Sequence, residues 1–160
     1  MALIEGFRVR NYRALRDVTL GKLSTQQQGE PLTPFTVVIG KNGAGKSTLF
    51  DAFGFVADCL STDVETACDD KQRGGFERMR SLGTSEPIQF EIYYREAKGE
   101  RPITYELAIN LDGSGRPFVQ SEVLKQRRKL QKYGRPFPFL RLDHGKGKVW
   151  AGEEAVEAAE

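Results

Sequence analysis

The chain has 160 residues, of which 39% are hydrophobic and 29% are charged, and its formal net charge is +2. These values are ordinary for one soluble globular domain with a sizeable core. The net charge is too small to indicate a nucleic-acid or membrane partner by itself, and no apolar run approaches the roughly 18 residues that a membrane span needs.

The N-terminal part of the chain predicts two short strands, a loop and a buried strand. Residues 7–11 alternate between apolar and basic side chains, which predicts a strand. Residues 12–15 are typical of a turn, and residues 17–20 of a second short strand. Residues 24–34 are polar and predict a surface loop. Residues 35–39 are rich in β-branched residues, which is typical of a buried parallel strand.

After Gly45 the apolar pattern changes to that of a helix. Apolar residues recur at spacings of three and four: Leu49, Phe53, Val56 and Leu60. Gly54 is a mild interruption, because glycine costs stability inside a helix. Residues 61–85 are mostly polar and predict a loop with one short helix.

The second half of the chain predicts an antiparallel meander. Alternating apolar residues occur in four segments, and turn signals separate the first three: residues 88–94, 103–111, 118–130 and 137–142. Such strands have one face on the core and one face in water. The Ala- and Glu-rich tail, residues 153–160, predicts the start of a helix.

A phosphate-binding loop is the clearest motif. The pattern G-x-x-x-x-G-K-[ST] is matched at every position by Gly40, Lys41, Asn42, Gly43, Ala44, Gly45, Lys46 and Ser47. The glycines allow backbone N–H groups to curl around phosphates, and the following helix adds its positive N-terminal end. We expect Lys46 to contact the β- and γ-phosphates, Ser47 to ligate Mg²⁺ and Thr48 to bond the α-phosphate. A chance match is the alternative, and the strand–loop–helix context argues against it.

Two segments around this loop resemble those of a known group of ATPases. Residues 7–15 resemble the I-x-N-F-R-x-[FL] opening of RecF-like and SMC-like ATPases of the ABC type. Residues 38–52 look like their hhGxNGxGKSxLhDAh signature. Residues 73–76 and 85–88 further resemble predicted AAA-type ATPases grouped with overcoming-lysogenization-defect nucleases.

The resemblance implies an α/β fold, the first lobe of a P-loop NTPase head with a mixed core sheet plus an antiparallel β-subdomain. Residues 1–160 would be the N-terminal lobe of a longer head. The P-loop core would span about residues 1–60, a loop and helix residues 61–86, and the β-subdomain about residues 87–150. The resemblance also places Arg13 near the ribose or base of the nucleotide, and an exposed turn arginine is the alternative.

The same resemblance implies the ligands and partners. The expected cofactors are ATP and Mg²⁺, and the choice of ATP over GTP rests on the resemblance alone. Two heads of the full-length protein would form a homodimer around ATP, and DNA is a further partner. We expect no membrane partner and a cytoplasmic location, because the N-terminus lacks a signal-peptide pattern and two cysteines form no disulfide framework.

The parts needed for hydrolysis are not found in this sequence. A Walker B segment ends in Asp-Glu, and its nearest look-alike, residues 107–112, contains Asn110 and is followed by Gly113. We therefore assign no catalytic residue here and expect little or no turnover from these residues alone. A non-catalytic nucleotide sensor or protein-interaction module is the alternative. A small GTPase or kinase is disfavoured, since no N-K-x-D base-reading motif is present.

A basic run follows the third segment of the meander. It comprises Lys125, Arg127, Arg128, Lys129, Lys132 and Arg135, with Tyr133 among them. One interpretation is contact with the phosphates of DNA or RNA. The interpretation that we favour from the sequence is a charged strand edge that protects against aggregation. His144 is the only histidine, and no nucleophile beside it supports a catalytic role.

Overall fold

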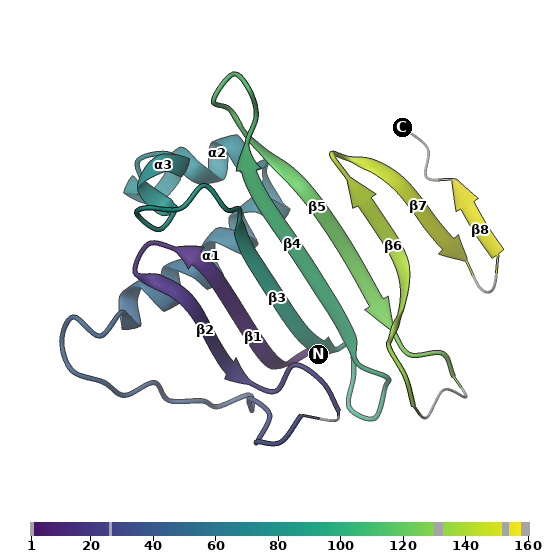
Figure 1. Cartoon of the computed structure of the whole chain (residues 1–160). Helices are drawn as coiled ribbons and strands as arrows, with labels where there is room; N and C mark the ends of the chain where they lie inside the picture. The colour runs from purple at the N-terminus through teal and green to yellow at the C-terminus, as the bar shows by residue number, and fades with distance from the viewer. Residues whose placement is uncertain (1, 26, 130–132, 152–153, 158–160) are drawn as a thin grey trace.

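The computed structural model describes residues 2–25, 27–129, 133–151 and 154–157. One eight-stranded sheet dominates it, with the order β2-β1-β3-β4-β5-β6-β7-β8 and antiparallel pairing throughout (Figure 1). The strands are β1 (Leu3–Tyr12), β2 (Leu15–Gly21), β3 (Ile88–Arg95), β4 (Ile103–Leu111), β5 (Pro117–Gln126), β6 (Phe137–Asp143), β7 (Lys146–Ala151) and β8 (Glu154–Glu157).

The helical segments lie between β2 and β3 in the chain and cover one face of the sheet (Figure 1). They are α1 (Lys46–Ser61), α2 (Val64–Asp69), the 3-10 turn η1 (Asp70–Gln72) and α3 (Phe76–Met79). Asp63 begins α2 by accepting a hydrogen bond from the Thr66 backbone N–H at 2.8 Å. Among the described residues, no helix is both long and apolar enough to cross a membrane.

The core forms where α1 packs on β1, β3 and β4. Alternation in β1 buries Phe7 and Val9 on the helix side, where the ring of Phe7 stacks on Phe53 at 3.8 Å. Phe55 of α1 lies 5.8 Å from Phe90 of β3, measured between ring centroids. The predicted helix is confirmed, and its apolar stripe is what fixes α1 against the sheet.

The predicted strand at residues 35–39 is not formed. These residues are coil and bends, and their side chains are largely exposed: Phe35 at 82%, Val37 at 62% and Ile39 at 90%. A parallel strand needs a parallel neighbour for its backbone groups, and the described sheet offers none. The apolar run is therefore present without the pairing that would make it a strand.

The prediction of a mixed core sheet is also wrong, because every described pair is antiparallel. Strand β1 lies between β2 and β3 and runs opposite to both. The strands of residues 3–21 and of residues 88–151 therefore share one sheet. In the described part of the chain, one sheet thus contains strands of both the predicted core, residues 1–60, and the predicted β-subdomain, residues 87–150.

The predicted C-terminal helix is wrong where the structure describes the tail. Residues 154–157 form β8, which pairs with β7 from Ala151↔Glu154 to Lys148↔Glu157. Strand pairing overrides the helix propensity of alanine and glutamate here, because propensity is a weak prior against tertiary contacts. The rest of that predicted helix, residues 153 and 158–160, lies outside the described residues.

Candidate nucleotide-binding site

The G-x-x-x-x-G-K-S segment forms a tight loop that leads directly into α1. Gly43 has a backbone φ of 82° and Gly45 one of 89°, both in the left-handed region that side chains with a Cβ rarely adopt. The Ala44 N–H donates to the Lys41 carbonyl at 3.1 Å, which closes the turn. Helix α1 then begins at Lys46, as the motif predicts.

The first turn of α1 has no internal acceptor for its free N–H groups. Gly45 is the N-cap residue and has no side chain, so no side-chain capping bond is made. No acidic residue lies in this first turn either. The helix therefore presents uncapped donors and a partial positive charge, a combination that favours an anion such as phosphate.

The Lys46 ammonium lies above this loop. Its Nζ donates to the carbonyls of Gly40 and Lys41, the second at 2.7 Å. A hollow of about 300 Å³ adjoins it, lined by Ala14, Asn42, Gly43, Gly45, Lys46, Ser47 and Thr48. The structure thus brings six of the predicted site residues around one hollow. Gly40, Lys41 and Ala44 shape the loop and are not among the lining residues.

Arg13 lies next to this hollow without lining it. Its backbone φ is 50°, and its N–H donates to the Met79 carbonyl at 2.6 Å. Its guanidinium points to Asp51 of α1, with Nη2 at 3.5 Å from the carboxylate. The neighbouring residue, Ala14, is the one that reaches the hollow. Contact between Arg13 and a ribose or base stays a prediction.

A buried arginine, Arg73, forms ion pairs with two carboxylates of α1. Arg73 is only 2% exposed, and its guanidinium lies 3.0 Å from Asp51, 2.7 Å from Asp58 and 2.9 Å from the Ala67 carbonyl. The Tyr12 hydroxyl donates to the second Asp51 oxygen at 2.6 Å. This network ties the P-loop helix to β1 and to the connection after α2.

Sequence reasoning missed this network, although a signal was present. Asp51 and Asp58 are seven residues apart, so they lie on the same face of α1 two turns apart. Gly54 lies between them, and a Cβ built there would come 3.6 Å from the Arg73 guanidinium. Two acids flanking a glycine on an otherwise apolar helix indicate a buried cation, but not which one.

Comparison with known proteins agrees with the motif and its geometry. The family model described as "AAA domain, putative AbiEii toxin, Type IV TA system" matches residues 35–157. The chain belongs to this family. No curated protein sequence matches it. The AAA domain so identified is a P-loop, nucleotide-binding domain of the ATPase type.

The acid of the Walker B look-alike, Asp112, forms hydrogen bonds within its own turn. Asp112 lies in the turn between β4 and β5, where one carboxylate oxygen accepts from the Ser114 N–H at 2.8 Å and the Arg116 N–H at 3.0 Å. These bonds fix the hairpin. None of the described residues lining the P-loop hollow is acidic. The rejection of residues 107–112 as Walker B is thus supported by what Asp112 does.

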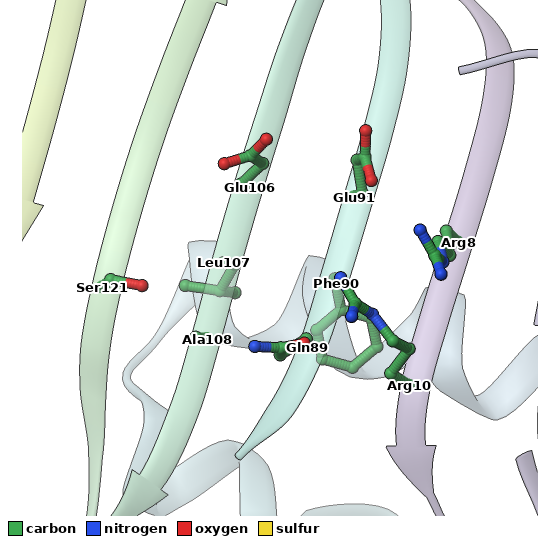
Figure 2. Close-up of a pocket in the computed structure, with 9 residues that line it drawn as sticks. All are labelled: Arg8, Arg10, Gln89, Phe90, Glu91, Glu106, Leu107, Ala108 and Ser121. Carbon is green, nitrogen blue, oxygen red and sulfur yellow. The ribbon is translucent and has the colours of Figure 1, made fainter. Parts of the chain in front are cut away.

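A second, polar hollow of about 160 Å³ lies on the sheet face opposite the helices of the AAA domain. Figure 2 shows Arg8 and Arg10 of β1 beside Glu91 of β3 and Glu106 of β4. Gln89 also lies here, paired with Arg10 on one side and Ala108 on the other, within the meander as expected. The hollow is built by strand alternation and is separate from the P-loop.

Proposed function

We propose that this AAA domain binds Mg-ATP through residues 40–48, with the triphosphate on the N-terminus of α1. The observation that carries the proposal is the uncapped, acid-free first turn of the helix behind a glycine loop. Phosphate oxygens would accept from these N–H groups. Lys46 would turn from the loop carbonyls to the β- and γ-phosphates, and the Ser47 hydroxyl would ligate Mg²⁺.

Calorimetric titration with ATP and Mg²⁺ tests this proposal. Lys46→Ala should weaken binding at least about tenfold, because a charge aimed at the phosphates is removed. Lys41→Ala is the matched control, since it removes the same charge from an exposed residue that does not line the hollow. Equal binding by the wild type and the Lys46→Ala variant would contradict the proposal.

We further propose that the domain is the first lobe of an ABC-type head, of the RecF-like, SMC-like or overcoming-lysogenization-defect-like kind. Phe35, Val37 and Ile39 support this, because their exposed run matches a buried parallel strand that lacks neighbours. Further strands of the full-length protein would pair there, and two heads would then close on ATP. DNA transactions, repair or phage defence would be the setting.

Light scattering of the full-length protein with and without Mg-ATP tests the head-dimer proposal. The expected outcome is a dimer with ATP and a monomer with the Lys46→Ala variant, because the γ-phosphate would bridge the two heads. ATP binding without any change of mass would instead favour the second candidate, a non-catalytic nucleotide sensor. The absence of an acid among the described lining residues supports that second candidate.

A further inference from the structure

A third hollow lies near the β6 and β7 end of the sheet, away from the helices. Strands β6 and β7 extend past the part that α1–α3 cover (Figure 1). Where β5 ends and β6 begins, there is a hollow of about 410 Å³, within the size range of small-ligand pockets. We call it the basic–aromatic hollow. Four cations line it: Arg101, Arg127, Arg128 and Lys129.

Three aromatic rings form its apolar part: Phe137, Phe139 and Trp150. All three are partly exposed and none belongs to the buried core. The rings of Phe137 and Trp150 meet edge to face at 5.7 Å, and the Arg128 guanidinium lies 4.7 Å above the Phe137 ring. Flat, partly exposed rings beside guanidinium groups are surfaces on which another planar group can stack.

Positive charge is concentrated at this hollow. None of the described residues lining it is acidic. The formal net charge of the chain is +2, so subtracting these four charges leaves −2 for the rest. Four cations around one hollow attract a polyanion.

Protection of a sheet edge does not explain these charges. Strand β5 is internal, because it pairs with β4 on one side and with β6 on the other. The basic run starts at the end of this internal strand and continues into the connection to β6. Lys132 lies outside the described residues. The strand-edge interpretation favoured from the sequence is thus contradicted for this run.

We propose that the basic–aromatic hollow binds single-stranded nucleic acid. Bases would stack on Trp150 and Phe137, and the arginines and Lys129 would contact phosphates. A duplex keeps its bases stacked inside and could use only the charges. An acidic protein segment could likewise use the charges but not the ring faces. The proposal does not depend on the P-loop, which lies at the N-terminus of α1.

Trp150 is the only tryptophan, so its fluorescence reports directly on this hollow. The experiment titrates the protein with single-stranded oligothymidylate of about 15 nucleotides, near the upper site size of OB folds that bind single strands. We expect saturable quenching of Trp150, with affinity that falls as salt rises. Oligouridylate in a parallel titration shows whether DNA or RNA is preferred, and quenching by either supports the proposal.

Matched variants locate the binding. Arg128→Gln should weaken the quenching titration about tenfold, because it removes both a phosphate contact and the guanidinium stacked on Phe137. Arg116→Gln is the control, an equal charge change at an exposed pair with Glu65. Lys46→Ala should bind the oligonucleotide like the wild type, which separates this proposal from nucleotide binding. Circular dichroism verifies that each variant is folded.

Three outcomes would overturn the proposal. The first is no quenching by either oligonucleotide at low salt. The second is that a labelled oligonucleotide binds, but Trp150 emission does not change and Arg128→Gln has no effect. The third is competition by polyglutamate or duplex DNA as effective as that of the single strand, which would make the hollow a general anion or acidic-protein surface.

Discussion

Two pairs of neighbouring carboxylates, one on each face of the sheet, differ in where their cationic partners lie. On the helix side, Asp51 and Asp58 share the buried guanidinium of Arg73, at 3.0 and 2.7 Å. On the open face, Glu91 and Glu106 are direct cross-strand partners in β3 and β4. Arg8 and Arg10 lie on the β1 side of this pair (Figure 2), and Lys125 of β5 forms an ion pair with Glu106.

One acid of each pair has a shifted pKa, and the two shifts differ in sign. Hydrogen bonds from Lys71 and then Arg73 hold the pKa of Asp58 below its usual range. Burial, and then the charge of Glu106, raises the pKa of Glu91. The hydrogen bonds from cations thus favour the charged form of Asp58, whereas burial beside a like charge disfavours the charged form of Glu91.

The largest expected effect comes from removing the shared cation. Arg73→Ala should lower the free energy of unfolding by at least about 2 kcal/mol, because Asp51 loses a charged partner in a largely buried site. Chemical denaturation measures it. Arg116→Ala, which breaks an exposed pair with Glu65, should cost about 0–1 kcal/mol. Equal losses in the two variants would contradict the comparison.

A smaller effect tests how tightly Arg73 is seated. Gly54→Ala adds a Cβ 3.6 Å from the Arg73 guanidinium, an ordinary contact distance. We expect it to raise the free energy of unfolding by about 0.5–1 kcal/mol, because alanine is the better helix former. Thermal unfolding followed by circular dichroism measures it. A destabilised Gly54→Ala variant would mean that the guanidinium needs the empty space.

The smallest effect concerns the open face and depends on pH. Glu91→Gln should raise stability at pH 7 by about 0.2–1 kcal/mol, because it removes a like charge opposite Glu106. The pKa of Glu91 is raised in the folded state, so this state binds more protons than the unfolded chain. Wild-type stability therefore falls as pH rises through that pKa.

The advantage of Glu91→Gln should accordingly vanish below the ordinary glutamate pKa of about 4.3, grow between this value and the raised pKa, and stay constant above it. Thermal unfolding across this pH range gives the profile. Glu96→Gln, in the exposed turn after β3, is the matched control for the loss of one carboxylate. A constant difference at all pH values would argue against a raised pKa at Glu91.

Local signals predicted much of the fold. The strand pattern of residues 7–11, the helix from Lys46 and the meander after residue 88 were all read from periodicity and are confirmed. The buried strand predicted at residues 35–39 is not formed, because a strand exists only with a pairing partner, which periodicity does not reveal. The helix predicted for the tail is wrong for the same reason, because pairing with β7 makes residues 154–157 a strand.

The sequence by itself determined the phosphate-binding loop, because its glycines, its lysine and the helix start are all local properties of residues 40–48. Only the tertiary structure decided which cation joins Asp51 to Asp58, and that the basic run meets Trp150 in one hollow. Arg73 lies 22 residues from Asp51 in the chain. Contacts over such separations depend on how the sheet and helices pack, which no local pattern specifies.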